Sequence, residues 1–361
     1  KTQISPKKFQ KIAFSQIAPF VHKKYELGEQ NPDWIKNMRG LGVKLHHARV
    51  RSIIFVHGTF AGNDPLDIIH LIGHFIQIND DFKSKIFSGL KKGQDTLWGD
   101  LGNFSVEYIK LFEAAINHQI QCQNFSWSSG NHHLARVKGT MKLIEQIYES
   151  HKHLSPHDKI LLWGHSHAGQ LFALMTQFFY SNRLMLEILK TAGISREEIK
   201  KSMKMRKVIK SFRIDFATFG TPPRYSWKLQ RHHRLLNIIN HRGADHLGGT
   251  PSGAFNTRDG DYVQQWGIIG SDIRAAVTAD QELNGKLDEF LGIGSDLKLW
   301  AQNIQYRKRI PDFGKTILVD YQDSSKFPNG FKTLFGHGVY TRFETMLFNL
   351  KTVVDNFYID H

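Results

Sequence analysis

The strand-like run Lys159-Ile-Leu-Leu-Trp163, apolar after its first residue, leads directly into the segment Gly164-His-Ser-His-Ala-Gly169, which consists of small and polar residues. The apolar stretch at 170–180 follows at once and predicts a buried helix. A buried strand that turns within a few residues into a helix needs small side chains there, because the two backbones come close together. Gly164 and Ala168 occupy the two flanking positions around Ser166. The segment therefore predicts a strand, a sharp turn and a helix, with Ser166 at the tip of the turn.

Further strand-like runs recur along the chain, separated by stretches with helical periodicity. The strand-like runs lie at 51–56, 120–127, 213–219, 234–240 and 316–321, and the helical patterns at 66–78, 133–151 and 340–357. Strands that alternate with helices predict an α/β fold, with a mostly parallel central sheet flanked by helices. In such folds the functional residues gather at the carboxyl ends of the strands.

The chain is predicted to form one domain over residues 51–361, preceded by an extension, residues 1–50, whose role the sequence does not indicate. Two stretches interrupt the alternation. Residues 182–210 carry nine Lys and Arg against three Glu, and residues 246–315 separate the last two strands. We expect both to be helical cap insertions, one of them acting as a lid over the site.

The charge balance favours anionic partners. The chain has 48 Lys and Arg against 33 Asp and Glu, a formal net charge of +15. Such an excess suits phosphate-bearing partners, but the interleaved basic and aromatic residues of known RNA-binding modules are absent. We therefore expect an anionic membrane surface rather than nucleic acid as the partner. No stretch approaches the roughly 20 apolar residues of a membrane span.

Cysteine usage and the first residues leave the compartment open. Cys122 is the only cysteine, so an internal disulfide is impossible and a cysteine-based zinc site is not expected. The first residues contain neither an initiator Met nor the apolar core of a signal peptide. Both a cytoplasmic protein and one delivered by a signal outside this chain are compatible with these features.

A serine hydroxyl becomes a good nucleophile only when a base removes its proton. Ser166 is therefore predicted to be a nucleophile, the alternative being a tight structural turn. Two backbone N–H groups must stabilise the oxyanion that forms. His167, the residue after Ser166, should supply one of them. Thr59 or Phe60, which follow the strand-like run at 51–56, should supply the other.

The general base is predicted to be His337, which follows the last strand and lies between two glycines. Other candidates for the base are His57, His165, His167 and His246.

The acid that orients the base should follow the preceding strand, which indicates Asp245, with Asp320 and Asp323 as alternatives. Although the chain has 20 His, no group has the spacing of a metal site, so a catalytic metal is not expected.

The order Ser166, Asp245, His337 resembles the nucleophile–acid–base order of the α/β-hydrolase superfamily. Within it, the chain is most similar to the class 3 type lipases. Four segments resemble theirs: the elbow at 164–169, the Gly-Thr-Pro turn at 220–222, the acid segment at 240–251, and His337 with Tyr340. The resemblance covers residues 50 to 350 in order, but it is close only at these segments.

This resemblance implies an α/β-hydrolase fold and hydrolysis of a carboxylic ester through an acyl-enzyme. Ser166 would attack, His337 would transfer the proton and Asp245 would orient the imidazole. The implied activity is that of a lipase or phospholipase acting on acyl lipids, without a cofactor. Two alternatives stay open: an acyltransferase that uses the same triad, and a basic protein that binds nucleic acid or a membrane on a hydrolase scaffold.

Overall fold

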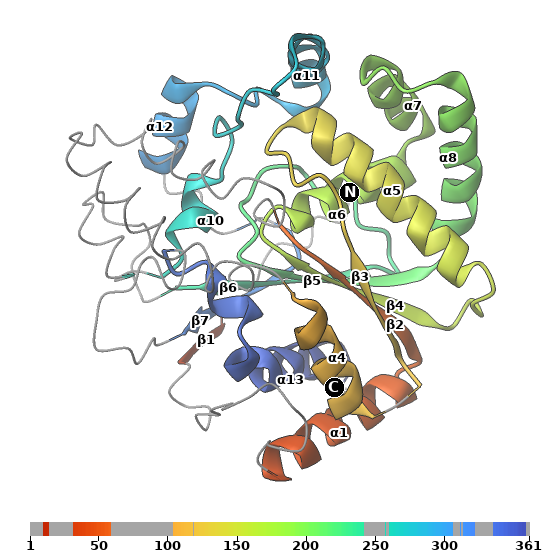
Figure 1. Cartoon of the computed structure of the whole chain (residues 1–361), viewed down its shortest axis with the longest axis vertical. Coiled ribbons are helices and arrows are strands. Elements are labelled where there is room, and N and C mark those ends of the chain that lie inside the picture. Colours follow the sequence, from red (N-terminus) through yellow and green to blue (C-terminus); the bar gives the residue numbers. More distant parts are fainter. Residues whose placement is uncertain are drawn as a thin grey trace.

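The computed structural model shows helices on both sides of a central parallel sheet (Figure 1). It describes residues 10–13, 32–58, 104–117, 119–241, 257, 260–305, 311, 313–321 and 335–358. The strands are β1 (Gln10–Ala13), β2 (Val50–Val56), β3 (Gln121–Phe125), β4 (Lys159–His165), β5 (Arg213–Phe219), β6 (Arg234–Asn240) and β7 (Lys315–Asp320). They form a seven-stranded sheet in the order β1-β7-β6-β5-β4-β2-β3, and each of its six strand pairings is parallel.

The direction of chain progression through the sheet reverses at β2. From β2 the chain adds β3 on one side, and then crosses back to add β4, β5, β6 and β7 in turn on the other side. In open parallel sheets the crevice at such a reversal, outside the carboxyl ends of the strands, is where ligands bind. The segments that follow β2 and β4 begin at this position.

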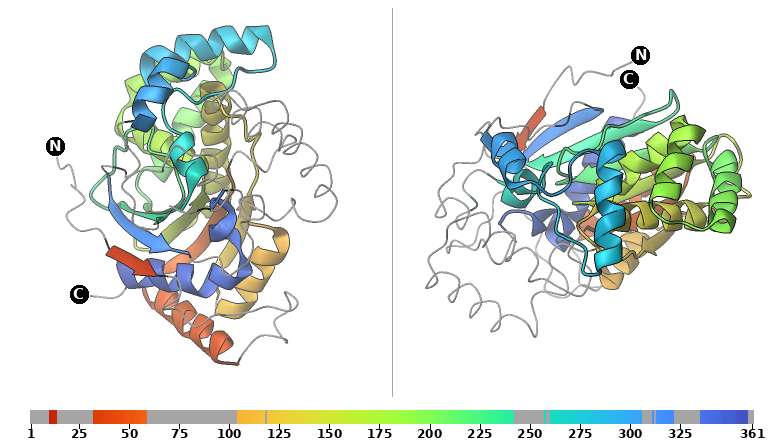
Figure 2. Two further views of the ribbon diagram at one scale, coloured as in Figure 1. Left: turned by 90° about the vertical axis from the view of Figure 1, so that its left-hand side faces the viewer. Right: turned by 90° about the horizontal axis from the view of Figure 1, so that it is seen from above.

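One face of the sheet is covered by α1 (Pro32–His47), α4 (Val106–Ile116) and α13 (Met346–Phe357), which lie below the sheet in the left view of Figure 2. Alternate strand side chains, among them Phe55 and Trp163, pack against these helices because successive residues of a strand point to opposite faces.

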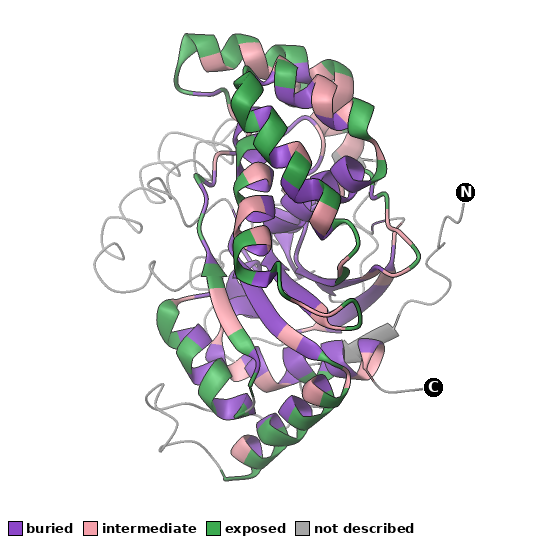
Figure 3. Cartoon of the chain, turned by 90° about the vertical axis from the view of Figure 1, so that its right-hand side faces the viewer, coloured by how far each residue is buried: buried purple, intermediate pink, exposed green. Residues whose placement is uncertain are grey.

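The other face is covered by α5 (His133–His151), α6 (Ala168–Tyr180), α7 (Asn182–Thr191) and α8 (Arg196–Ile209). The strand side chains that point this way include Leu162 and Phe216. Figure 3 shows the resulting pattern: the inner strands are buried, the edge strand β3 is partly exposed, and the outer surfaces of the helices are exposed. α7 and α8 contain eight of the nine basic residues of 182–210, and their apolar face, including Met185 and Ile209, lies in the core.

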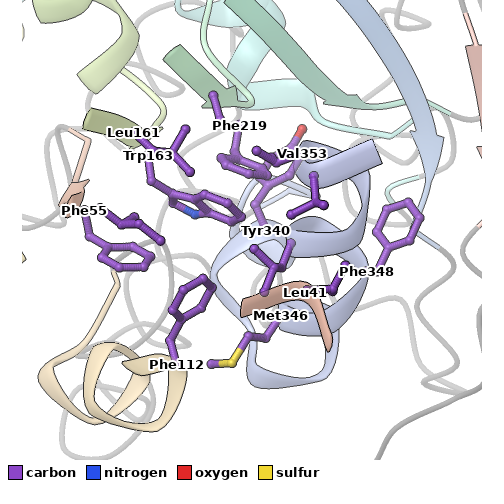
Figure 4. Close-up of a cluster of buried hydrophobic side chains, with 14 of the residues drawn as sticks. Leu41, Phe55, Phe112, Leu161, Trp163, Phe219, Tyr340, Met346, Phe348 and Val353 are labelled. Atoms are coloured by element: carbon purple, nitrogen blue, oxygen red, sulfur yellow. The ribbon is translucent and has the colours of Figure 1, made fainter. Parts of the chain in front are cut away.

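The core on the α1 side is rich in aromatic residues (Figure 4). Phe55 contacts Phe112 edge to face, with ring centroids 5.1 Å apart. The ring centroids of Trp163 and Phe219 lie 4.7 Å apart. Aromatic pairs in these geometries add to the free energy gained by burying the rings. The cluster thereby fixes the carboxyl halves of β2, β4 and β5, which carry the loops described below.

Within the described residues between β6 and β7, the helices are α10 (Tyr262–Trp266), α11 (Thr278–Leu291) and α12 (Leu297–Gln305). α11 packs on α5 and α7, with Leu287 buried in the core. Between α10 and α11 the buried Asp272 carboxylate forms ion pairs with Arg136 of α5 and with Arg224 from the segment after β5. The described part of this insertion is therefore joined to the main body by buried charges.

The sequence predicted the six strands from β2 to β7 correctly to within two residues, and it predicted the helix at 133–151 at its observed bounds. The closing helix is shorter than predicted, because residues 338–341 and 343–345 form 3₁₀ turns before α13. Residues 1–50, for which no structure was predicted, contribute β1 and α1. The predicted helix at 66–78 lies outside the described residues. No helix among the described residues is both long and apolar enough to cross a bilayer.

Candidate active site

Ser166 lies in a left-handed backbone conformation between β4 and α6, with φ of 56°. This conformation is unfavourable for a residue other than glycine and persists only where the surroundings enforce it. The Ser166 N–H donates to the carbonyl oxygen of Phe219 at 2.8 Å, and the Thr221 hydroxyl donates to the Ser166 carbonyl oxygen at 2.7 Å. Both partners belong to β5 and the turn after it, so the neighbouring strand holds the elbow in place.

The small residues of the elbow are required by its packing. A Cβ atom on Gly164 would lie 2.4 Å from the Phe172 ring and 3.1 Å from the Ala168 Cβ atom. A Cβ atom on Gly169 would lie 2.4 Å from the Thr221 hydroxyl oxygen. Ala168 fits because its methyl group faces a glycine. This explains how an alanine can occupy one flanking position of the predicted turn.

The backbone that follows β2 passes directly over the nucleophile candidate. A Cβ atom on Gly58 would lie 2.3 Å from the Ser166 Cβ atom and 2.9 Å from its Oγ atom. The preceding residue, His57, is held by Trp127, whose indole N–H donates to the His57 carbonyl oxygen at 2.9 Å. Thr59 and Phe60, the predicted oxyanion donors, lie outside the described residues, but the loop that leads to them starts beside Ser166.

His337 is hydrogen-bonded to a carboxylate through its Nδ1 atom, which lies 2.8 Å from Asp261 Oδ2. Both side chains are fully buried. Two further donors reach the same carboxylate: the Tyr340 hydroxyl at 2.8 Å from Oδ2 and the Gln264 N–H at 2.8 Å from Oδ1. Three donors on one carboxylate favour its ionised form. The pair thus has the geometry of an acid that orients a catalytic histidine.

The carboxylate beside His337 belongs to none of the three aspartates predicted from the sequence. Asp245 and Asp323 lie outside the described residues, and Asp320 is the last residue of β7, opposite Ala13 of β1. Asp261 was missed because it follows β6 by 21 residues, whereas the acid was predicted close to the strand end. The signal that could have found it is the glycine before it, since Gly260-Asp261 parallels Gly336-His337.

Hydrogen bonds join the loops that carry the acid and the base. The Asp261 N–H donates to the Asn240 carbonyl oxygen at 3.0 Å, and the Asn240 side-chain amide donates to the Gly336 carbonyl oxygen at 2.9 Å. The Tyr340 hydroxyl accepts from the Asn240 N–H at 2.7 Å. Burial and the negative charge of Asp261 hold the pKa of Tyr340 well above its usual range, so this hydroxyl stays protonated and donates to Asp261. Asn240, the last residue of β6, therefore positions both members of the pair.

Another contact places the His337 ring beside the elbow. Its centroid lies 4.4 Å from that of His165, the residue before Ser166, and His165 Nε2 lies 2.9 Å from the His337 carbonyl oxygen. His165 was one of the alternative bases, but its ring nitrogen holds the backbone of His337 instead. Because Asp261 engages Nδ1 of His337, proton transfer would fall to Nε2. The Ser166 hydroxyl is buried and makes no hydrogen bond within the described part of the chain.

His167 is the N-cap residue of α6, and its ring is buried. Burial lowers the pKa of this ring well below its usual range, and the positive charges of Arg136 and Arg224 lower it further. An imidazole with so low a pKa accepts a proton only weakly, so His167 is a poor candidate for the base. Its backbone N–H lies at a helix amino terminus, where partial positive charge favours an anion.

The other histidine candidates have separate surroundings. His57 is buried beside Trp127, and its pKa is lowered mainly by burial. His246 lies outside the described residues. Among residues that the structure describes, no group of three or more His, Cys, Asp or Glu is arranged to hold a metal ion.

Comparison of the chain with models of protein families, with curated proteins and with solved structures found no match.

Proposed function

We propose that the chain is a serine hydrolase with the α/β-hydrolase fold, and that it cleaves carboxylic esters of acyl lipids through an acyl-enzyme. Ser166 is the nucleophile, His337 the general base and Asp261 the acid that orients it. The observation that carries this proposal is the buried hydrogen bond of 2.8 Å between His337 and Asp261, next to a serine held at positive φ. These residues follow in the order serine, aspartate, histidine, which is the order of that superfamily.

The sheet topology supports the same assignment. Ser166 follows β4 and Gly58 follows β2, the two adjacent strands at the reversal of the sheet order. A serine at the carboxyl end of a buried parallel strand, just before a helix, matches the nucleophile elbow of α/β-hydrolases. The close contact of Gly58 with Ser166 also agrees with a second oxyanion donor from the loop after β2.

The first half of the reaction forms the acyl-enzyme. His337 Nε2 removes the proton from Ser166 as the Oγ atom attacks the ester carbonyl carbon, and Asp261 stabilises the imidazolium through Nδ1–H. The carbonyl oxygen becomes an oxyanion, which accepts from the His167 N–H and from the loop after Gly58. The C–O bond to the alcohol then breaks, and His337 returns its proton to the leaving oxygen.

The second half releases the acid. A water molecule gives a proton to His337 and attacks the acyl carbon, and Ser166 regains its proton as the ester bond to the enzyme breaks. An alcohol in place of the water would give acyl transfer. The proposal of a lipid substrate draws on the sequence resemblance to lipases and on the net charge of +15, which suits an anionic lipid surface.

A fluorophosphonate probe tests the nucleophile. Wild-type protein should be labelled covalently, and Ser166→Ala should not be. Ser211→Ala is the matched control, because Ser211 is an exposed serine whose hydroxyl donates to the Val208 carbonyl oxygen, just before β5 begins. Equal labelling of wild type and Ser166→Ala would refute the proposal.

A substrate panel then tests the chemistry. p-Nitrophenyl esters of increasing acyl length and phospholipid vesicles separate an esterase from a lipase or phospholipase. Product analysis with and without an added alcohol separates hydrolysis from acyl transfer. Ser166-dependent labelling without turnover of any acyl ester would exclude the lipid substrate while leaving the nucleophile intact.

A further inference from the structure

A second site candidate lies at the other end of the strands. A pocket of about 470 Å³ is lined by residues at the amino ends of β4, β5 and β6. Its lining residues are Lys159, Arg213, Asp215, Arg231, His232 and Arg234. Lys159 is the first residue of β4, whose carboxyl end leads to Ser166. At about 3.3 Å per residue, the length of this strand separates the pocket from the elbow by roughly 20 Å.

The lining of the pocket is strongly cationic. It holds four Lys or Arg residues against one carboxylate, a formal excess of +3 without counting His232. That carboxylate is already occupied, because Arg234 donates to both of its oxygens, at 2.8 Å and 2.5 Å. The Tyr358 hydroxyl donates to the same carboxylate at 2.9 Å. Asp215 is therefore engaged by Arg234 rather than by Arg213 or Arg231.

The sheet register places like charges side by side. Lys159 and Arg213 are direct partners on the adjacent strands β4 and β5. Neighbouring strands lie about 4.8 Å apart, and like charges directly opposite one another are destabilising. An anion bound between these two side chains would remove that repulsion.

Aromatic rings hold two of the cations before any ligand arrives. The Arg234 guanidinium lies 4.9 Å from the Phe357 ring centroid and 5.0 Å from that of Tyr358. The Lys159 ammonium lies 5.5 Å from the Tyr358 ring centroid. Cations fixed in this way lose less conformational freedom on binding.

From these features we infer that the pocket binds a phosphate-bearing anion. Arginine presents a planar set of donors that matches phosphate oxygens, and lysine adds a compact charge. The phosphate group can belong to a soluble molecule or to a lipid head group. The site does not overlap the candidate active site, so its ligand is distinct from the ester that would be cleaved, and the inference stands apart from the proposed function.

The test compares two double variants that remove the same charge. Arg213→Gln with Arg231→Gln removes two exposed cations from the pocket, whereas Arg39→Gln with Arg196→Gln removes two exposed cations from α1 and α8. Inorganic pyrophosphate is titrated calorimetrically into wild type and both variants, and thermal midpoints confirm that each is folded. Wild type and the α1/α8 variant should bind alike, and the pocket variant should bind at least about tenfold more weakly.

Vesicles identify the source of the phosphate. Phosphatidylcholine vesicles, with or without phosphatidylinositol bisphosphate, are sedimented with each protein. The site is assigned to a lipid head group if vesicle binding meets three conditions. It must require the phosphoinositide, it must be lost only in the pocket variant, and pyrophosphate must displace it. Pyrophosphate binding without vesicle binding assigns it to a soluble phosphate compound. Absence of both, or equal weakening in the two double variants, would overturn the inference whether or not Ser166 is a nucleophile.

Discussion

Gly336 and Gly260 lie so close that a Cβ atom on Gly336 would come within 2.2 Å of the Gly260 carbonyl oxygen. Both residues have positive φ, of 83° and 109°. Each immediately precedes a member of the candidate catalytic pair, since His337 follows Gly336 and Asp261 follows Gly260. The close approach of these two glycines therefore sets the distance between base and acid.

Replacement of Gly336 by alanine should separate the two loops and reduce esterase activity by about 100-fold, because small displacements of catalytic groups have effects of that order. Gly292→Ala is the matched control. Gly292 has a similar φ of 84°, but no atom lies within 4 Å of the Cβ position. Both variants should lose about 1–3 kcal/mol of stability from backbone strain. Rates of p-nitrophenyl ester hydrolysis and urea unfolding should show that only Gly336→Ala loses the activity; a similar loss in both would mean that strain alone is responsible.

Asp261→Asn should reduce kcat by about 10³- to 10⁴-fold, because an amide at this position no longer favours the catalytic tautomer of His337. Asp245→Asn, which changes the acid indicated by the sequence, should have little effect. Steady-state kinetics of the two variants compare the assignments directly. A large loss in Asp245→Asn with normal activity in Asp261→Asn would restore the sequence-based choice.

Tyr340→Phe removes one of the three donors to Asp261 while leaving the aromatic ring in the core. The loss of one hydrogen bond to a charged group, about 1.5–3 kcal/mol, should reduce kcat by roughly 10- to 100-fold if all of it appears in the transition state. The fluorophosphonate labelling rate should fall by a similar factor. An unchanged rate would show that the hydrogen bonds from His337 and Gln264 are sufficient to hold the carboxylate.

The strands and the elbow could be predicted because their signals are local. An uninterrupted apolar run within β4 indicates that this strand is buried. The turn after it needs small residues, and these stand close to Ser166 in the sequence. His337 could be predicted for a similar reason, since it follows the last strand between two glycines.

Asp261 could not be predicted in this way because long-range contacts place it. An isolated antiparallel bridge between His241 and Gly260 returns the chain to the end of β6. No periodicity or composition within residues 241–260 encodes that return. The same holds for β1, whose four residues, Gln-Lys-Ile-Ala, become a strand by pairing with β7, more than 300 residues later.

Buried neutral histidines should make the fold sensitive to acid. Burial lowers the pKa of His233 from 6.5 to about 3, and the charge of the neighbouring His232 adds to this effect. Between these pH values the unfolded chain binds a proton that the folded chain does not, so stability is full above about pH 6.5 and falls as the pH decreases. The slope for one such group is about 1.4 kcal/mol per pH unit.

His233→Gln should therefore reduce the pH dependence of the free energy of unfolding by up to about 1.4 kcal/mol per pH unit below pH 6.5. Urea denaturation at a series of pH values measures this slope. His47→Gln is the control, since it removes a histidine that is exposed on α1. If the slopes of wild type and His233→Gln were the same, His233 would not be the residue whose protonation is suppressed by folding.

Asp272→Asn should destabilise the protein by about 3–5 kcal/mol, because it leaves two buried guanidinium groups without their counter-charge. Asp272 Oδ1 lies 2.8 Å from Arg136 Nη2, and Oδ2 lies 2.7 Å from Arg224 Nη2. Burial alone would raise the pKa of Asp272, but the two arginines lower it below its usual range, so the carboxylate is charged throughout the physiological range.

The measurement is urea denaturation, with Glu282→Gln as the control because it removes an exposed carboxylate from α11 of the same insertion. The insertion also carries Asp261, so esterase activity should fall with stability in Asp272→Asn and stay normal in the control. A loss below about 1 kcal/mol, the range of an exposed ion pair, would mean that water reaches the guanidinium groups. The described part of the insertion would then be a mobile lid rather than a fixed part of the core.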